Sequence, residues 1–194
     1  MSLRDAGQAS LAYFYFDFRD EEKKQDIRNF LTSLLVQLSA DSGTCCKIIS
    51  RLYSTHGKGM QQPSNDALTN CLREMLSVTA QQPIYLIVDA LDECPDSSGM
   101  PTPREDVLSL LEDLLHLGLS NLRICVTSRP EIDIKNVLGP LAGSAVSIHD
   151  ESGQKKDISD YVRNTVYADK KMGRWRSDEK ELVIEELSKK VDGM

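Results

Sequence analysis

The sequence predicts an α/β fold, a three-layer αβα arrangement in which helices cover both faces of a parallel sheet. Short apolar stretches alternate with longer segments of helical periodicity along the 194 residues, and this alternation is typical of parallel sheets. One stretch, Ile84 to Val88, has five apolar residues in a row. Because it has no polar side, it is expected to be a parallel strand buried on both faces.

Composition limits the classes of partner. The net charge is −7, with 40% hydrophobic and 27% charged residues, which is ordinary for a globular chain of this length. Nucleic acids and membrane surfaces need a basic face, so neither is expected as a partner. No apolar stretch approaches the roughly 18 residues of a membrane span. The five cysteines are odd in number and lack metal-binding spacing, which indicates reduced thiols in a cytoplasmic protein.

The first elements are a strand and two helices. An aromatic-rich stretch from Leu11 to Phe18 predicts the first strand. Helical periodicity begins at Gln25, and a glycine-containing loop from His56 to Met60 ends the second helix. The inward residues of the two helices are expected to be Ile27, Phe30, Leu31, Leu34, Leu35 and Leu38 in the first and Cys45, Ile48, Ile49, Leu52 and Tyr53 in the second.

Candidate capping residues predict where the next two helices begin. Ser64 is a candidate N-cap for a third helix, which precedes the apolar strand. Beyond that strand, Thr102 with Pro103 and Glu105 has the pattern of a capping box with proline in the first turn. Gly118 is expected to end this helix.

The rest of the chain predicts a strand from Leu122 to Thr127, a short helix from Glu131 to Leu138 and a last strand from Ala145 to Ile148. Two helices follow, with inward residues Ile158, Tyr161, Val162, Thr165 and Val166 in the first and Val183, Leu187 and Val191 in the second, which begins at Ser177. We therefore divide the chain into a core, 1–150, and a helical extension, 151–194.

Acidic residues follow the apolar strand. Asp89 stands where the strand ends, and ligands of open α/β sheets bind at the carboxyl ends of strands. Asp92 and Glu93 come soon after. Three carboxylates within five residues repel one another unless a cation or solvent screens them, and oxygen ligands suit Mg²⁺. In the alternative interpretation, Asp89 only begins an exposed turn.

The strand ends, taken together, resemble the NACHT family of signal-transduction NTPases, in the STAND class of P-loop NTPases. The likeness rests on the aromatic strand with its Leu-rich helix, the acidic block from Ile87 to Cys94, and the Cys125 to Pro130 strand end, in that order. It is closest to the fungal, nephrocystin-like type, which has a helix similar to Asp157–Val162. That type continues beyond a Gly-Met pair, where this chain ends at 193–194.

The resemblance implies roles for the acids. Asp89 corresponds to the acid that holds Mg²⁺ in the Walker B motif. Glu93, with Asp92 as its neighbour, corresponds to the acid that positions the attacking water. The bound nucleotide would be ATP or GTP.

The resemblance also implies a role for the next strand end. Arg129 corresponds to a sensor arginine that contacts the γ-phosphate, and Thr127 and Ser128 belong to the same cofactor-binding segment. A guanidinium suits this role because it pairs with phosphate through two donors and keeps its charge. Alternatively, Arg129 is an exposed turn residue or the ion-pair partner of Asp89 or Glu93.

A phosphate loop of the form G-x-x-x-x-G-K-[ST] is missing. The segment Gly57-Lys58-Gly59 departs from it, since Gly59 replaces the hydroxyl residue and Leu52 the first glycine; we expect a flexible loop there. In the family, the first, central strand and the Walker A loop lie upstream of the strand that begins near Leu11. We therefore expect a chain truncated after Walker A, or a reduced relative.

These expectations lead to two functions. In the first, the chain is part of a NACHT module that binds and slowly hydrolyses ATP or GTP with Mg²⁺ and thereby switches oligomerisation with protein partners. The resemblance implies fungal self/non-self recognition or cell death, next to effector domains and ankyrin repeats. In the second, it is a nucleotide-free protein-interaction module.

The basic segment Lys170 to Arg176 is interpreted as a loop that Trp175 anchors to the core.

Overall fold

A computed structural model describes residues 9–19, 25–78, 82–97, 99–147 and 152–190. The chain divides into two compact units, 1–142 and 143–194.

The first unit contains a sheet of three parallel strands, β1 (Ser10–Tyr15), β2 (Ile84–Asp89) and β3 (Leu122–Val126). The strand order is β1-β2-β3, so β2 has a neighbour on both sides. Residue 86 pairs with 12 on one side and with 124 on the other. The predicted α/β fold with a parallel sheet flanked by helices is confirmed, but the described helices do not cover both faces as expected, since Tyr13, Tyr85 and Ile87 on one face are exposed.

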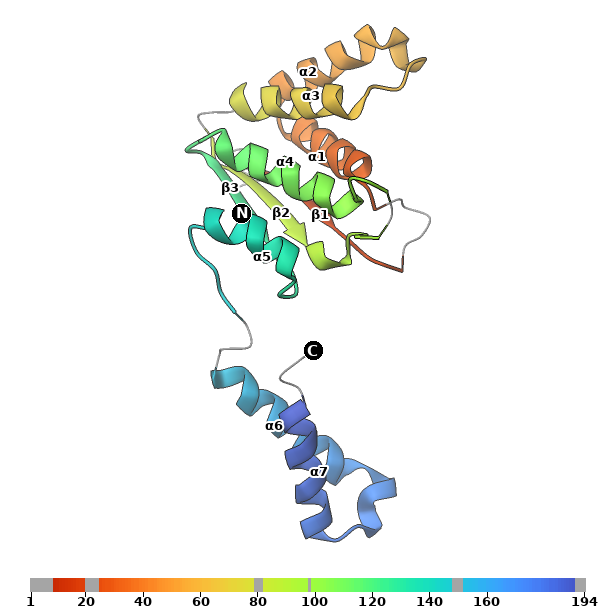
Figure 1. Ribbon diagram of the computed structural model, residues 1–194, viewed down its shortest axis with the longest axis vertical. Helices are drawn as coiled ribbons and strands as arrows, with labels where there is room; N and C mark the ends of the chain where they lie inside the picture. The colour runs from red at the N-terminus through yellow and green to blue at the C-terminus, as the bar shows by residue number, and fades with distance from the viewer. Residues whose placement is uncertain (1–8, 20–24, 79–81, 98, 148–151, 191–194) are drawn as a thin grey trace. The chain divides into compact units, whose positions relative to one another are not determined.

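Five helices lie in the described residues of this unit. They are α1 (Ile27–Asp41), α2 (Gly43–Thr55), α3 (Asn65–Val78), α4 (Pro103–His116) and α5 (Ile132–Leu138), with short 3₁₀ turns η1 (Gly57–Gly59), η2 (Leu91–Glu93) and η3 (Gly139–Leu141). Helices α2 and α3 pack against each other and against α1, while α4 contacts α1 and α5. Figure 1 shows α2 and α3 away from the strands, beyond α1.

Side-chain caps define where the helices begin. The Asp26 carboxylate accepts a hydrogen bond from the N–H of Asn29 at the start of α1. The predicted capping box at Thr102 and Glu105 is present, with both hydrogen bonds formed. Ser64 Oγ also accepts from the N–H three residues later, as predicted. These starts follow local sequence because a cap satisfies donors of its own first turn.

The core lies between one face of the sheet and helices α1 and α4, and it continues between α1, α2 and α3. Its fully buried members, with no side-chain area exposed, include Ala12, Phe30, Leu31, Leu34, Ile84, Leu86, Val88, Val107, Leu111 and Leu114. All six predicted inward residues of α1 are buried. Burial of this many aliphatic side chains is the main stabilising term of the unit.

The prediction that β2 is buried on both faces was wrong. Ile84, Leu86 and Val88 are buried, whereas Tyr85 and Ile87 on the opposite face are exposed. A run of apolar residues shows that a strand lacks a polar side, but only the positions of the helices decide which face they cover.

Three further predictions need correction, two in this unit and one just beyond it. The strand expected from Ala145 does not form over residues 145–147, and Ile148 lies outside the described residues. Tyr53, expected to face inward, is 57% exposed. The segment Gly57–Gly59, expected to be a flexible loop, is a turn of 3₁₀ helix whose three residues all have positive φ.

The second unit is a helical hairpin of α6 (Ser152–Ala168) and α7 (Ser177–Lys190), joined by the 3₁₀ turn η5 (Lys170–Arg174). Arg163 pairs with Glu181 through two hydrogen bonds of 2.6 and 2.8 Å. These bonds, together with one from the Tyr167 hydroxyl, lower the pKa of the Glu181 carboxyl. The two helices are therefore tied by a forked ion pair as well as by apolar contact.

Burial in the hairpin differs from the prediction. Val166 is buried as expected, but Tyr161 and Leu187 are exposed, and Ile184 faces inward instead. Trp175 is 45% exposed, so the expectation that it anchors the basic segment to the core was wrong. Val191 lies outside the described residues. None of the helices in the described ranges is both long and apolar enough to span a membrane.

Candidate functional site

The candidate site lies at the carboxyl ends of β2 and β3. Asp89 is the last residue of β2, and its carboxylate accepts a hydrogen bond from the Thr127 hydroxyl just beyond β3. The same hydroxyl oxygen accepts from the N–H of Ala90 at 3.0 Å. Thr127 therefore ties the first turn after β2 to the neighbouring strand.

The turn after Asp89 depends on a left-handed residue. Ala90 has φ 53° and ψ 47°, a conformation that is uncommon for residues other than glycine. It directs the chain into η2, where the N–H of Leu91 donates to the Thr127 carbonyl at 3.0 Å. A small residue at position 90 limits the steric cost of this turn, and the acids that follow are brought back toward β3.

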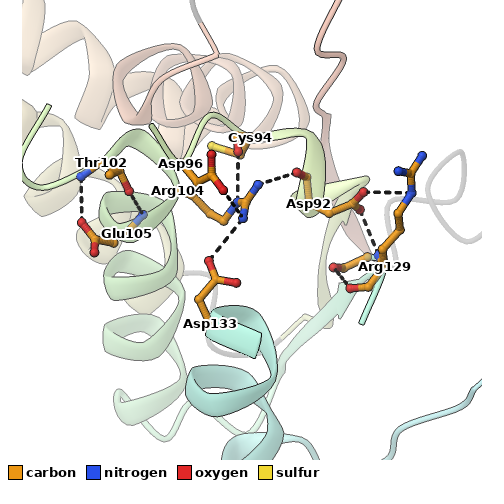
Figure 2. A network of polar contacts seen from close by, with 9 residues as sticks. Asp92, Cys94, Asp96, Thr102, Arg104, Glu105, Arg129 and Asp133 are labelled. Carbon is orange, nitrogen blue, oxygen red and sulfur yellow. Dashed lines mark hydrogen bonds and ion pairs between the residues drawn. The ribbon is translucent and has the colours of Figure 1, made fainter. Parts of the chain in front are cut away.

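Asp92 contacts Arg129 through both carboxylate oxygens. Oδ1 accepts from the Arg129 N–H at 3.0 Å, and Oδ2 lies 3.4 Å from the Arg129 Nε. The Asp92 side chain is 9% exposed, whereas that of Arg129 is 72% exposed. Figure 2 shows the terminal nitrogens of Arg129 directed away from Asp92. The ion pair that was an alternative for Arg129 therefore exists, but with Asp92 rather than with Asp89 or Glu93.

Glu93 has a separate partner. Its Oε2 accepts from the N–H of Phe18 at 3.2 Å, so it contacts the segment that follows β1. The Ser128 hydroxyl donates to the Arg129 carbonyl at 2.5 Å and so turns toward its own loop. The site residues are thus assembled from the segments after all three strands.

The three acids do not converge on one point. Asp89, Asp92 and Glu93 each accept hydrogen bonds from different groups, and the described residues contain no group of three His, Cys, Asp or Glu side chains able to hold a metal. A cage of three carboxylates therefore does not fit. Asp89 alone is exposed at the strand end, and Mg²⁺ is commonly held by one carboxylate together with water and substrate phosphates.

Arg104, which the sequence analysis missed, lies beneath the acidic turn. It is in the first turn of α4 but is 6% exposed. Its guanidinium donates to the carbonyls of Asp92 and Cys94 at 2.6 and 3.0 Å. The sequence does contain one signal for such a role, because a cation in the first turn of a helix opposes the helix dipole.

Cys94 closes the turn as a buried thiol. It is 1% exposed, and burial raises the pKa of the Cys94 thiol to about 12. A neutral thiol is a poor nucleophile. Cys94 therefore packs beneath the turn as a neutral thiol.

The Gly57–Gly59 segment does not contribute a phosphate loop to this site. Figure 1 shows the connection between α2 and α3 well away from the carboxyl ends of the strands. Gly59 has a φ of 87°, a conformation that favours glycine, and a Cβ atom there would also meet the ring of Tyr53 at 2.8 Å.

Comparison with known proteins gives one match. The family described as "Nephrocystin 3, N-terminal" matches residues 2–129, about two thirds of the chain. Searches of curated proteins and of solved structures found no match. The matched range spans all three strands, the acidic turn and Arg129. The chain belongs to the Nephrocystin 3 N-terminal family.

Proposed function

We propose that this chain is the part of a signal-transduction NTPase that recognises Mg²⁺ and the terminal phosphate of ATP or GTP. In this proposal, Asp89 holds the metal, Glu93 orients the attacking water and Arg129 binds the γ-phosphate. Thr127 keeps the Asp89 carboxylate directed at the site. In the complete protein, slow hydrolysis would switch oligomerisation with protein partners in a cytoplasmic signalling pathway.

The observation that carries this proposal is the convergence of an acid and an arginine at adjacent strand ends. The exposed Asp89 ends β2, and the largely exposed guanidinium of Arg129 follows β3. Carboxyl ends of parallel strands are where α/β folds bind ligands. A carboxylate for the metal and a guanidinium for the phosphate oxygens are complementary to a magnesium–triphosphate complex.

The test is equilibrium binding of fluorescent ATP and GTP analogues, with and without Mg²⁺. We expect a micromolar Kd that requires Mg²⁺ and that rises about tenfold or more in Asp89→Asn, equivalent to about 1.4 kcal/mol. Asparagine retains an oxygen that accepts from Thr127, so this variant keeps the turn and loses the charge. Asp66→Ala, in the exposed first turn of α3, is the control and should bind like the wild type.

A nucleotide-free protein-interaction module is the second candidate. The exposed face of the sheet favours it, because Tyr13, Tyr15, Tyr85 and Ile87 are 49%, 58%, 40% and 36% exposed there. Parallel sheets usually have both faces covered, and exposed apolar patches often mark interaction sites. If the folded chain binds no nucleotide at millimolar concentration with Mg²⁺, the second candidate replaces the first.

A further inference from the structure

Arg104 connects three segments of the first unit (Figure 2). Besides the carbonyls of Asp92 and Cys94, its Nη1 contacts the carboxylates of Asp96 and Asp133, each at 3.3 Å. Asp96 belongs to the segment after β2, and Asp133 to α5, which follows β3. Arg104 itself is on α4. One buried guanidinium therefore links the acidic turn after β2 to helix α5 after β3.

These contacts need the shape of arginine. The guanidinium donates in a plane, and its donors reach two carbonyls and two carboxylates at once. A lysine ammonium is a single point with three donors on a flexible stem. Because Arg104 is buried, any carbonyl left without a donor is also denied water, and its loss is costly. A positive charge alone would therefore not replace Arg104, because the site needs several donors with fixed directions.

Asp92 transmits this restraint to the site. Arg104 fixes its carbonyl at 2.6 Å, and its side chain holds both the backbone and the Nε of Arg129. The Asp92 side chain has little freedom because it is nine-tenths buried. The Arg129 guanidinium keeps its terminal nitrogens directed outward (Figure 2). Arg129 therefore projects from the strand end in a direction set by Asp92.

We propose that Arg104 is a positioning residue that acts through Asp92 to direct Arg129 at the terminal phosphate of a bound nucleoside triphosphate. This inference rests on the proposed function. Nε stays on Asp92 while the two terminal nitrogens bind phosphate oxygens in a fork. Pre-alignment matters because an unrestrained arginine loses rotamer entropy on binding. Asp92 is accordingly a support for Arg129 rather than a group that touches substrate.

The first experiment compares triphosphate with diphosphate affinity in Arg104→Lys. We expect about a tenfold loss for the triphosphate analogue and little change for the diphosphate, because only the terminal phosphate reaches Arg129. In an Arg129→Gln background, Arg104→Lys should cause no further loss of triphosphate affinity. Arg73→Lys, which alters an ion-paired arginine of α3, is the matched control. Equal losses for both nucleotides, or losses that add in the double variant, would overturn the inference.

Asp92→Asn provides a second route if Arg104→Lys fails to fold. It leaves the carbonyl contact with Arg104 in place and removes the charge that holds Nε. We expect the same selective loss of triphosphate affinity. Unchanged affinity for both nucleotides in a folded Asp92→Asn would contradict the proposed role.

A measurement without nucleotide separates this inference from the proposed function. The Arg129 N–H donates to Asp92 Oδ1, so its exchange with deuterium, followed by NMR, reports on this contact. We expect exchange to accelerate about tenfold in both Asp92→Ala and Arg104→Lys. If it does while the wild type binds no nucleotide, the restraint of Arg129 by Arg104 and Asp92 stands, but the proposed function falls and so does the role of Arg129 at a phosphate. If nucleotide binds but Arg129 exchange is unaffected by Arg104→Lys, the proposed function stands and the positioning is wrong.

Discussion

The two faces of β2 are built from similar residues but lie in different environments. Leu86 has no exposed side-chain area, whereas the adjacent Ile87 is 36% exposed. On the covered face, Leu86 pairs with Ala12 of β1 on one side and with Ile124 of β3 on the other. On the exposed face, Ile87 lies in the same way between Tyr13 and Cys125. Helices α1 and α4 pack on the first of these faces. Burial in this strand is therefore decided by helices distant in sequence and not by the strand itself.

The difference bears on the candidate site because one of its residues, Asp89, stands at the end of the exposed face of β2. Asp89 continues the exposed set of Tyr85 and Ile87 along β2, since alternate residues of a strand share a face. Burial on the covered face stabilises the unit, whereas the exposed face ends at the Asp89 carboxylate. A substitution on one face is thus expected to alter folding, and on the other to alter binding.

Removing side chains from the two faces should have the largest effect. Leu86→Ala should lower the free energy of unfolding by about 2–5 kcal/mol, because it leaves a cavity in a packed core. Ile87→Ala should cost about 1 kcal/mol or less, since much of that side chain already meets water. Urea unfolding followed by circular dichroism measures both. Similar costs would mean that the exposed face is covered in solution.

The modification rates of two cysteines should also differ between exposed and buried positions. Cys125 is exposed beside Ile87, whereas Cys94 is buried and burial raises its pKa to about 12. At pH 8, iodoacetamide should modify Cys125 at least about a hundredfold faster than Cys94, because the thiolate is the nucleophile. Mass spectrometry of peptides gives both rates, and Cys125→Ser verifies the assignment.

The pH dependence of Cys94 follows from the direction of its shift. Its pKa in the folded chain lies above the ordinary value of 9.0. The neutral buried thiol therefore contributes stability that is complete below about pH 9 and is lost as pH rises toward 12. Rapid modification of Cys94 at pH 8 under native conditions would contradict its burial.

The smallest effect concerns the edge of the sheet at β1. Gln37 of α1 accepts from the Tyr13 N–H at 3.1 Å and donates to the Tyr13 carbonyl at 2.8 Å, so it occupies backbone groups that another strand would use. Gln37→Ala should cost about 1 kcal/mol of stability and should increase self-association in light scattering. Gln37→Glu keeps the acceptor and loses the donor, so it should show part of this effect. Unchanged stability and mass in Gln37→Ala would exclude this role.

The sequence predicted the local elements well, for reasons that lie within a few residues. The capping box at Thr102 and the Ser64 cap are confirmed, because a cap bonds to the first turn of its own helix. The inward stripe of α1 is confirmed because its 3.6-residue period is visible without any partner. The expectations that Trp175 packs on the core and that a strand forms at 145–147 were wrong. Short apolar segments do not specify what they pack against.

At the site, the sequence by itself determined which residues stand at the strand ends: Asp89 after β2 and Thr127 to Arg129 after β3. Only the tertiary structure decided how they pair. It joined Asp92 to Arg129, separated Glu93 from the other acids and placed Arg104 beneath the turn. The physical reason is that strand ends follow from local apolar runs, whereas hydrogen-bond partners and covered faces depend on segments that meet only when the chain is folded.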